Sequence, residues 1–137
     1  MDLKVKLERF REEAKKNVAC VDNYKMFVKF LLENNFTECL AIIRGNWHWV
    51  KSKNIKIFDL SEIGEIGKTY YENGKIRIES TYKGGNLDGE YKEYYDNGNI
   101  HIESTYKGGN LDGEYKEYYK NGKIYSECSY KNGYLIN

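Results

Sequence analysis

Few side chains in this sequence have the types and spacing that catalysis or metal binding requires. The two histidines, His48 and His101, stand 53 positions apart, and neither has a cysteine or histidine neighbour at the spacing of metal ligands. The three cysteines, Cys20, Cys39 and Cys128, lack a nearby histidine that could activate a thiolate. An odd number of widely spaced cysteines is typical of reduced thiols in a cytoplasmic protein, and we interpret all three as small apolar fillers.

The carboxylates recur too regularly to form a catalytic pair. Glu90 and Glu93 return with a 24-residue period and alternate with lysines, whereas acid–base catalysis needs one environment that separates two pKa values. Asp88 and Asp112 each precede a glycine, but the Asp-x-Asp-x-Asp-Gly spacing of a calcium loop is missing, and turn formation explains them. The sequence therefore predicts no enzyme, with no catalytic residues, no metal site and no cofactor.

The balance of charge and hydropathy argues against two other classes of protein. With 22 basic and 21 acidic side chains, the formal charge of +1 offers no basic face for nucleic acid. No apolar run approaches the roughly 18 residues of a membrane-spanning helix, and the charged N-terminal sequence lacks the apolar centre of a secretory signal. We therefore expect a cytoplasmic protein.

The elements that must position any functional residue divide into two kinds. All five phenylalanines and both tryptophans lie before residue 61, whereas 13 of the 14 tyrosines and 12 of the 13 glycines lie after it. Residues 1–60 hold 12 basic and 8 acidic side chains, and residues 61–137 hold 10 and 13. The change indicates an α+β fold, with a helical N-terminal segment over 1–44 followed by a β-hairpin repeat domain over 45–137.

Three short amphipathic helices are predicted in the first segment. Apolar residues recur at steps of three and four over 3–21, and the Asp2 carboxylate can cap this helix by accepting a free backbone N–H. A second helix is predicted over 22–33, before two asparagines that favour termination, and a third over 37–44 with Gly45 as its cap. Each helix must bury its apolar face against the others or against the repeats.

The second segment is an internal repeat with a period of 24 residues. Residues 79–95 recur unchanged at 103–119, and 21 of 24 positions are identical between 73–96 and 97–120. A looser copy follows at 121–137. Self-similarity at a period of this length indicates a supersecondary unit that is stacked several times along the chain.

Each unit is predicted to be a β-hairpin. The Asn-Gly pairs at 73–74, 97–98 and 121–122 are typical of two-residue type I′ turns, and tyrosine- and isoleucine-rich segments of strand character flank them. We expect the glycine-rich stretches at 83–89 and 107–113 to be longer loops between hairpins. The result is a single elongated antiparallel meander.

The predicted units are 65–88, 89–112 and 113–137. A degenerate first unit is predicted at 45–64, because Trp49-Val50 and the isoleucines at 55 and 57 stand where later units have tyrosines and isoleucines. Trp47 and Trp49 would then meet the helices, as the atypical terminal unit of a stack does.

Counting outward from Asn97-Gly98 predicts which side chains share a face of the sheet. The face expected to be the core face holds Tyr91, Tyr95, Ile100, Ile102 and Tyr106. The more polar face holds Glu90, Lys92, Tyr94, His101, Glu103 and Thr105. Lys92 opposes Glu103 as a favourable cross-strand pair, and a bulge is expected at Glu93, which fits the apolar face badly.

Two features of the repeats predict binding. The first is a row of tyrosines on the polar face with lysines two positions before them, because aromatic side chains on a polar surface are common contact anchors. This candidate surface consists of Tyr70, Tyr94, Tyr118, Lys68, Lys92 and Lys116. The second is the last hairpin, where Ile124, Tyr130 and Tyr134 mark a candidate edge that could pair with another chain or with a second copy in a homo-oligomer.

The repeat resembles the MORN-repeat family, in the bacterial variant of the YwqK type. The matching pattern is Gly-Glu-Tyr-Lys-Glu-Tyr-Tyr-(Asp/Lys)-Asn-Gly-(Asn/Lys)-Ile, as at 89–100, followed by Glu-Ser-Thr-Tyr-Lys-Gly-Gly-Asn-Leu-Asp-Gly, as at 103–113. The resemblance covers about 65–137 and implies tandem hairpins with non-catalytic roles in protein assembly, sometimes at membranes. Bacterial relatives are commonly labelled antitoxins, and some carry a lipid-kinase label that does not transfer, because this chain has no phosphate loop.

Together these features predict a non-enzymatic protein–protein interaction module, which could be antitoxin-like. The alternative is peripheral binding to a membrane surface or lipid headgroup through the lysine and tyrosine rows. The net charge of residues 61–137, 10 basic against 13 acidic side chains, weighs against this alternative because anionic lipids attract basic segments.

Overall fold

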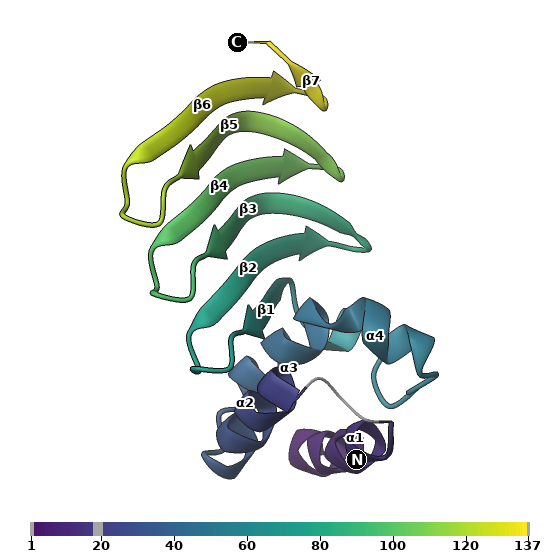
Figure 1. Cartoon of the computed structure of the whole chain (residues 1–137). Helices are drawn as coiled ribbons and strands as arrows, with labels where there is room; N and C mark the ends of the chain where they lie inside the picture. The colour runs from purple at the N-terminus through teal and green to yellow at the C-terminus, as the bar shows by residue number, and fades with distance from the viewer. Residues whose placement is uncertain (1, 18–20, 137) are drawn as a thin grey trace.

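The computed structural model describes residues 2–17 and 21–136, and it consists of a group of helices followed by one open sheet (Figure 1). The sheet contains seven antiparallel strands in sequence order, which confirms the predicted α+β meander. The elements are α1 (Leu3–Lys16), α2 (Val21–Leu32), α3 (Phe36–Gly45), α4 (Trp47–Ser52), the 3-10 helix η1 (Leu60–Glu62), β1 (Ile66–Tyr70), β2 (Ile76–Lys83), β3 (Asn86–Tyr94), β4 (Ile100–Lys107), β5 (Asn110–Tyr118), β6 (Ile124–Lys131) and β7 (Tyr134–Leu135).

The first three helices follow the apolar periodicity of the sequence. The Asp2 carboxylate accepts a hydrogen bond from the Val5 amide at 3.0 Å, so it caps α1 as predicted. Asn34 adopts a left-handed φ of 57° just beyond the end of α2, where asparagine is tolerated. Val18 and Cys20, which the sequence assigned to the first helix and to a reduced thiol, lie outside the described residues.

Residues 45–64 do not form the predicted degenerate hairpin. They contain α4 and η1 instead, because Val50 and Ile55 are drawn into the core of the helices, where Val50 is 2% exposed. A helical turn places Trp47 and Val50 on one side. Tertiary packing therefore overrides the match of Trp49-Val50 to the tyrosine pairs of later units, which suggested a strand.

The hydrophobic core lies among the helices and at their contact with β1. Phe10 is its centre, with ring centroids 5.4 Å from Phe27 and 6.3 Å from Phe58. On the face of the sheet that was predicted to be the core face, by contrast, Tyr91 and Ile102 are only half-buried. The prediction of a buried face was therefore wrong for β3 and β4. A single sheet without a covering layer has no interior, and its tyrosines keep part of each ring in water.

Helix α3 covers the first edge of the sheet by close backbone contact. A Cβ atom at Gly45 would lie 2.7 Å from the backbone nitrogen of Lys68, so only glycine allows this approach. The amide of Tyr70, on the same outer edge, donates to the Asn23 side chain at 2.9 Å. The helices therefore satisfy an edge that would otherwise be free to pair.

A buried arginine also joins the two parts. Arg44, at the end of α3, stacks its guanidinium carbon 4.1 Å from the ring centroid of Tyr82 and donates to the backbone carbonyl of Gly84. Burial lowers the pKa of the Arg44 guanidinium. The contact ties the helices to the first tight turn of the sheet.

The cross-strand register follows the prediction through most of the hairpin between β3 and β4. Tyr91 pairs with Ser104, Lys92 with Glu103 and Glu93 with Ile102. The expected bulge occurs between Glu93 and Tyr94, and beyond it Tyr94 pairs with Ile100.

The two kinds of turn are exchanged relative to the prediction. The two-residue turns are at 84–85, 108–109 and 132–133, and Gly108 and Gly109 have the positive φ of 58° and 91° that a type I′ turn needs. At Asn97-Gly98 only the glycine has a positive φ, and the Gly98 amide donates to the Tyr95 carbonyl at 3.0 Å. This pattern fits a type I turn followed by a left-handed glycine, the longer hairpin loop.

Each unit hydrogen-bonds the next through side chains that the repeat preserves. At the longer loops the Asn73 amide donates to the Asp96 carbonyl at 2.7 Å, and Asn97 donates to the Lys120 carbonyl at 3.1 Å. At the tight turns the Asp88 carboxylate accepts from the Gly108 amide at 3.0 Å. The asparagines and aspartates of the motif therefore connect neighbouring hairpins, which explains their recurrence.

Candidate interaction surface

One face of the sheet carries a row of alternating charges that crosses six strands. The members of this row, which we call the charge ladder, are Lys68, Glu79, Lys92, Glu103, Lys116 and Glu127, and each is the direct cross-strand partner of the next. Opposite charges on neighbouring strands stabilise the pairing. The sequence predicted one such pair, Lys92 with Glu103. The structure adds the equivalent pairs on the neighbouring strands, so the row continues across the sheet.

Tyrosines accompany the charge ladder on the same face. The Tyr118 hydroxyl donates to a Glu103 carboxylate oxygen at 3.3 Å. Burial raises the pKa of Tyr94, and the Glu79 carboxylate raises it further. A shallow polar depression of about 290 Å³ lies along this part of the face, where Lys92 and Lys116 flank Glu103. The face combines rings with paired charges of both signs.

Two of the predicted surface residues are engaged by the helices and are not available to a partner. Tyr70 is 5% exposed, its ring centroid lies 6.1 Å from that of Phe30, and its hydroxyl donates to Glu38 at 3.4 Å. Burial, and then the Glu38 charge, raises the pKa of Tyr70. Lys68 pairs with the same Glu38 carboxylate at 3.0 Å. The remaining candidates, Lys92, Tyr94, Lys116 and Tyr118, form what we call the ladder face.

The opposite face holds tyrosine–glutamate pairs that the sequence did not indicate. The Tyr91 hydroxyl donates to Glu93 at 2.8 Å, and Tyr115 donates to Glu117 at 2.9 Å. Burial and this hydrogen bond raise the pKa of both tyrosines. The signal that could have found them is the two-residue spacing, because residues i and i+2 of a strand share a face.

At the candidate edge the three predicted residues have different environments. Ile124 is 54% exposed and Tyr134 is 77% exposed. Tyr130 is half-buried instead, with its ring centroid 5.9 Å from that of Tyr115 in a T-shaped contact on the opposite face. Strand β7 covers only the last part of β6, pairing Tyr130 with Leu135 and Lys131 with Tyr134.

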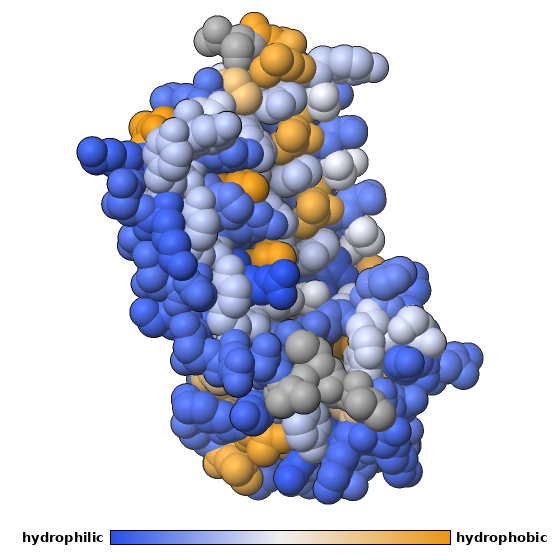
Figure 2. Space-filling model, in the orientation of Figure 1, coloured by the Kyte–Doolittle hydropathy of each residue, from blue (hydrophilic) through white to orange (hydrophobic). Residues whose placement is uncertain are grey.

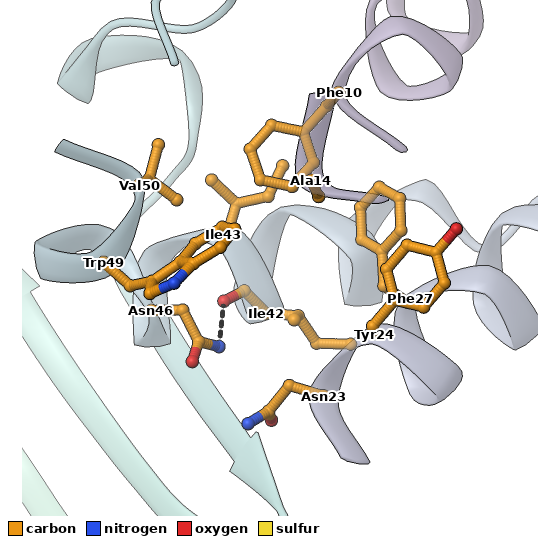
Figure 3. A pocket seen from close by; sticks show the side chains of 10 residues that line it. All are labelled: Phe10, Ala14, Asn23, Tyr24, Phe27, Ile42, Ile43, Asn46, Trp49 and Val50. Carbon is orange, nitrogen blue, oxygen red and sulfur yellow. Dashed lines mark hydrogen bonds between the residues drawn. The ribbon is translucent and has the colours of Figure 1, made fainter. Parts of the chain in front are cut away.

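A cavity of about 110 Å³ lies among the helices (Figure 3). Aromatic and aliphatic side chains such as Phe27 and Trp49 line it. Its two amides are engaged, since Asn46 donates to the Ile42 carbonyl at 2.8 Å and Asn23 accepts from the Tyr70 amide at 2.9 Å. The cavity is a gap in the core without a carboxylate or a nucleophile.

The other residues considered for chemistry are dispersed. Among residues 2–17 and 21–136, no three histidine, cysteine or acidic side chains gather closely enough to hold a metal ion. His101 stacks on Tyr95 with ring centroids 4.4 Å apart, and His48 is exposed on α4. Burial, together with Glu38, raises the pKa of the Cys39 thiol to about 12, so this thiol is inert. Of the described helices, none is long and apolar enough to cross a membrane.

Comparison with known proteins agrees with the repeat geometry. The family model for the MORN repeat variant matches three segments, residues 66–83, 87–107 and 111–132. No curated protein and no solved structure matches the chain. The three matched segments coincide with the strand pairs β1–β2, β3–β4 and β5–β6 of the meander, so residues 66–132 are MORN-type repeats.

Proposed function

We propose that the MORN-type repeats make this chain a non-enzymatic protein–protein interaction module that binds its partner through the ladder face. The observation that carries the proposal is the one-layer sheet. Figure 1 shows the described helices gathered at the β1 end, which leaves both faces of β3–β6 without a covering layer. Ordered side chains on an uncovered sheet are a surface for recognition, because a sheet normally buries at least one face.

The ladder face supports this role better than the opposite face does. Tyrosines at protein interfaces supply large rigid rings, and the hydroxyl can stay hydrogen-bonded. On the ladder face the tyrosines lie beside lysines, whereas on the opposite face Tyr91 and Tyr115 pack edge-on against Tyr106 and Tyr130, with ring centroids 5.5 and 5.9 Å apart. Because those rings already pack against each other within the sheet, they offer less surface to a partner.

The partner that fits the ladder face is a protein surface with charges of both signs. Figure 2 shows one face of the sheet, where apolar side chains lie as separate spots among polar ones and form no continuous apolar patch. Alternating lysines and glutamates favour complementary charges in register, and they do not attract a uniformly anionic surface. An antitoxin-like role, which the resemblance suggests, is a narrower form of the proposal in which the partner is a toxin protein.

The test compares two variants with the same change of charge. Lys92→Ala/Lys116→Ala removes two lysines of the ladder face, whereas Lys83→Ala/Lys107→Ala removes two exposed lysines at the tight turns. Each protein, tagged, is used to capture partners from native lysate, and the captured protein is then purified and titrated by calorimetry. We expect the ladder-face variant to lose about tenfold in affinity, about 1.4 kcal/mol, and the turn variant to bind as the wild type does.

Equal binding by the two variants contradicts the proposal. Vesicles of phosphatidylserine provide the second arm, because peripheral lipid binding is the alternative function. Co-sedimentation of the wild type with these vesicles at low salt, lost in the Lys92→Ala/Lys116→Ala variant, would replace a protein partner with a membrane surface.

A further inference from the structure

We propose that the outer edge of β6, over residues 124–128, binds an extended segment of a partner protein that carries a lysine between an aromatic and an acidic residue. The segment would pair antiparallel to β6, on the same side of β6 as β7 and next to it. This edge meets the charge ladder at Glu127, the cross-strand partner of Lys116, but it lies outside the four residues of the ladder face. The proposal stands whether or not that face binds a partner.

The first step is that this edge is open in the described part of the chain. Strand β7 pairs with Tyr130 and Lys131, and the Ile136 amide donates to the Ser129 carbonyl at 2.9 Å. Among residues 2–17 and 21–136, no strand pairs with the outer side of residues 124–128. At the equivalent positions of β4, Ile102, Glu103 and Ser104 pair with β5, and Glu103 faces Lys116. Over the described residues, the outer side of β6 is therefore paired along only part of its length.

The second step is that side chains at this edge have lost the cover they have in earlier units. Ile124 is 54% exposed and Leu135 is 62% exposed, whereas their counterparts Ile100 and Leu111 are half-buried. In Figure 2 apolar atoms gather at the end of the molecule where Figure 1 places β7. An exposed apolar edge next to unpaired backbone groups is a template for a further strand.

The third step is that the repeats specify what fits the edge. Strand β3 places Lys92 opposite Glu79 and Tyr91 opposite Ser80. Strand β5 repeats the arrangement, with Lys116 opposite Glu103 and Tyr115 opposite Ser104. In β6 the glutamate is Glu127 and Cys128 replaces the serine, so the incoming segment should place its lysine on Glu127 and its aromatic ring over Cys128.

The charges distinguish this occupant from a second copy of the chain. Glu127 is the one charged side chain in the open stretch 124–128. Pairing two copies in the register that sets Glu127 opposite Glu127 would bring two carboxylates together, whereas a lysine-bearing segment extends the charge ladder by one step. Charge complementarity therefore favours a different chain over self-pairing.

The experiment uses the full chain and a labelled synthetic peptide with the sequence of residues 113–119, Gly-Glu-Tyr-Lys-Glu-Tyr-Tyr. Binding is followed by fluorescence anisotropy, and the contact is mapped by amide chemical shifts. We expect binding that shifts the amides of 126–128, and about fivefold weaker binding of a peptide with glutamate in place of its lysine. The Glu127→Lys variant should prefer the glutamate peptide by a similar factor, and Glu127→Gln should bind both peptides alike.

The matched control is Glu90→Lys, an identical change of charge at an exposed position away from this edge. It should keep the preference of the wild type for the lysine peptide. The proposal is overturned by any of three results: no peptide binding, shifts confined to the ladder face, or a reversal of preference in Glu90→Lys as well. Sedimentation showing that the wild type pairs with itself through 124–128 and excludes the peptide would also overturn it.

Discussion

Gly45 and Gly67 set how closely the helices approach the sheet. A Cβ atom at Gly67 would lie 3.0 Å from the Cα atom of Gly45, and one at Gly45 would lie 2.8 Å from the Lys68 carbonyl carbon. Backbone atoms cannot move aside as the end of a flexible side chain can. These two glycines therefore allow the backbone of α3 to lie directly against β1.

Substitution of Gly45 by alanine tests this contact. We expect Gly45→Ala to lower the free energy of unfolding by about 2 kcal/mol, because the added methyl group forces α3 away from β1. The control is Gly85→Ala, since nothing lies within 4 Å of its Cβ position and its φ lies outside the left-handed region. It should change stability by no more than about 0.5 kcal/mol. Denaturant unfolding followed by circular dichroism measures both, and equal effects would show that the approach is not tight.

The tyrosine–glutamate pairs make stability depend on alkaline pH. The pKa of Tyr91 and of Tyr115 is raised in the folded protein, so the unfolded chain loses these protons first as the pH rises. The free energy of unfolding is therefore fully maintained below the ordinary tyrosine pKa of about 10 and falls above it. Acidic conditions leave this contribution intact.

We expect Tyr91→Phe/Tyr115→Phe to flatten that alkaline decline and to cost about 1 kcal/mol per lost hydrogen bond at neutral pH. Tyr119→Phe is the control, because the Tyr119 ring contacts Tyr125 and is exposed at the surface. Unfolding by guanidinium chloride at several pH values between neutrality and strong alkali provides the measurement. An unchanged slope in the double variant would refute the assignment.

Among the elements, the tight turns show most clearly how the units differ. The third turn uses Asn132-Gly133 where the second uses Gly108-Gly109, and Asn132 has a φ of 52°. Asparagine and glycine both tolerate this left-handed geometry, but a β-branched residue does not.

We therefore expect Gly108→Asn to be neutral or stabilising by about 0.5 kcal/mol, because it restricts the unfolded chain and keeps the turn. Gly108→Val should destabilise by about 1–2 kcal/mol through strain at positive φ. Thermal unfolding of the two variants measures the difference. A destabilised Gly108→Asn protein would mean that the first turn position requires glycine for a reason other than its φ.

The same turns explain what the sequence could and could not predict. Exact repetition fixes the period, and counting outward from Asn97-Gly98 places Lys92 opposite Glu103 without knowledge of the fold. An Asn-Gly pair, however, suits a type I′ turn and a type I turn with a left-handed glycine alike. The choice depends on contacts with the next unit, such as the bond from Asn97 to the Lys120 carbonyl.

Residues 45–64 and the ladder face illustrate a second limit. Whether Trp47 and Val50 join a strand or a helix is decided by the core that the other helices present, and local pattern cannot supply that information. Likewise Tyr70 matches Tyr94 and Tyr118 in sequence, but Glu38 and Phe30 bury it because it is in the first unit. Position in the stack, in addition to residue type, determines exposure.

At the scale of the whole molecule, the strands differ in how many other elements pack against them or pair with them. Strand β1 is held by α2 and α3, the middle strands by their neighbours, and the outer side of β6 by β7 over its last residues only. In a stack where each unit contacts its neighbours, opening starts at the less supported end.

Hydrogen exchange should therefore show a gradient of protection along the sheet. We expect the amides of β1 and β2 to be the slowest to exchange and the amides of 124–128 to be the fastest within the strands. Native-state exchange followed by nuclear magnetic resonance measures each amide. Uniform protection across the sheet would show that it opens as one cooperative unit.

Because the seven strands are stacked in sequence order, the number of strands sets the distance between the two ends of the sheet. Neighbouring strands lie about 4.8 Å apart, which sets the outer strand about 29 Å from β1, and each further hairpin would add about 9.6 Å together with the rotation of the sheet's twist. Gaining or losing one hairpin would change the distance and the angle between the two ends while leaving the chemistry of each end unaltered. Length can thus vary independently of what the molecule recognises.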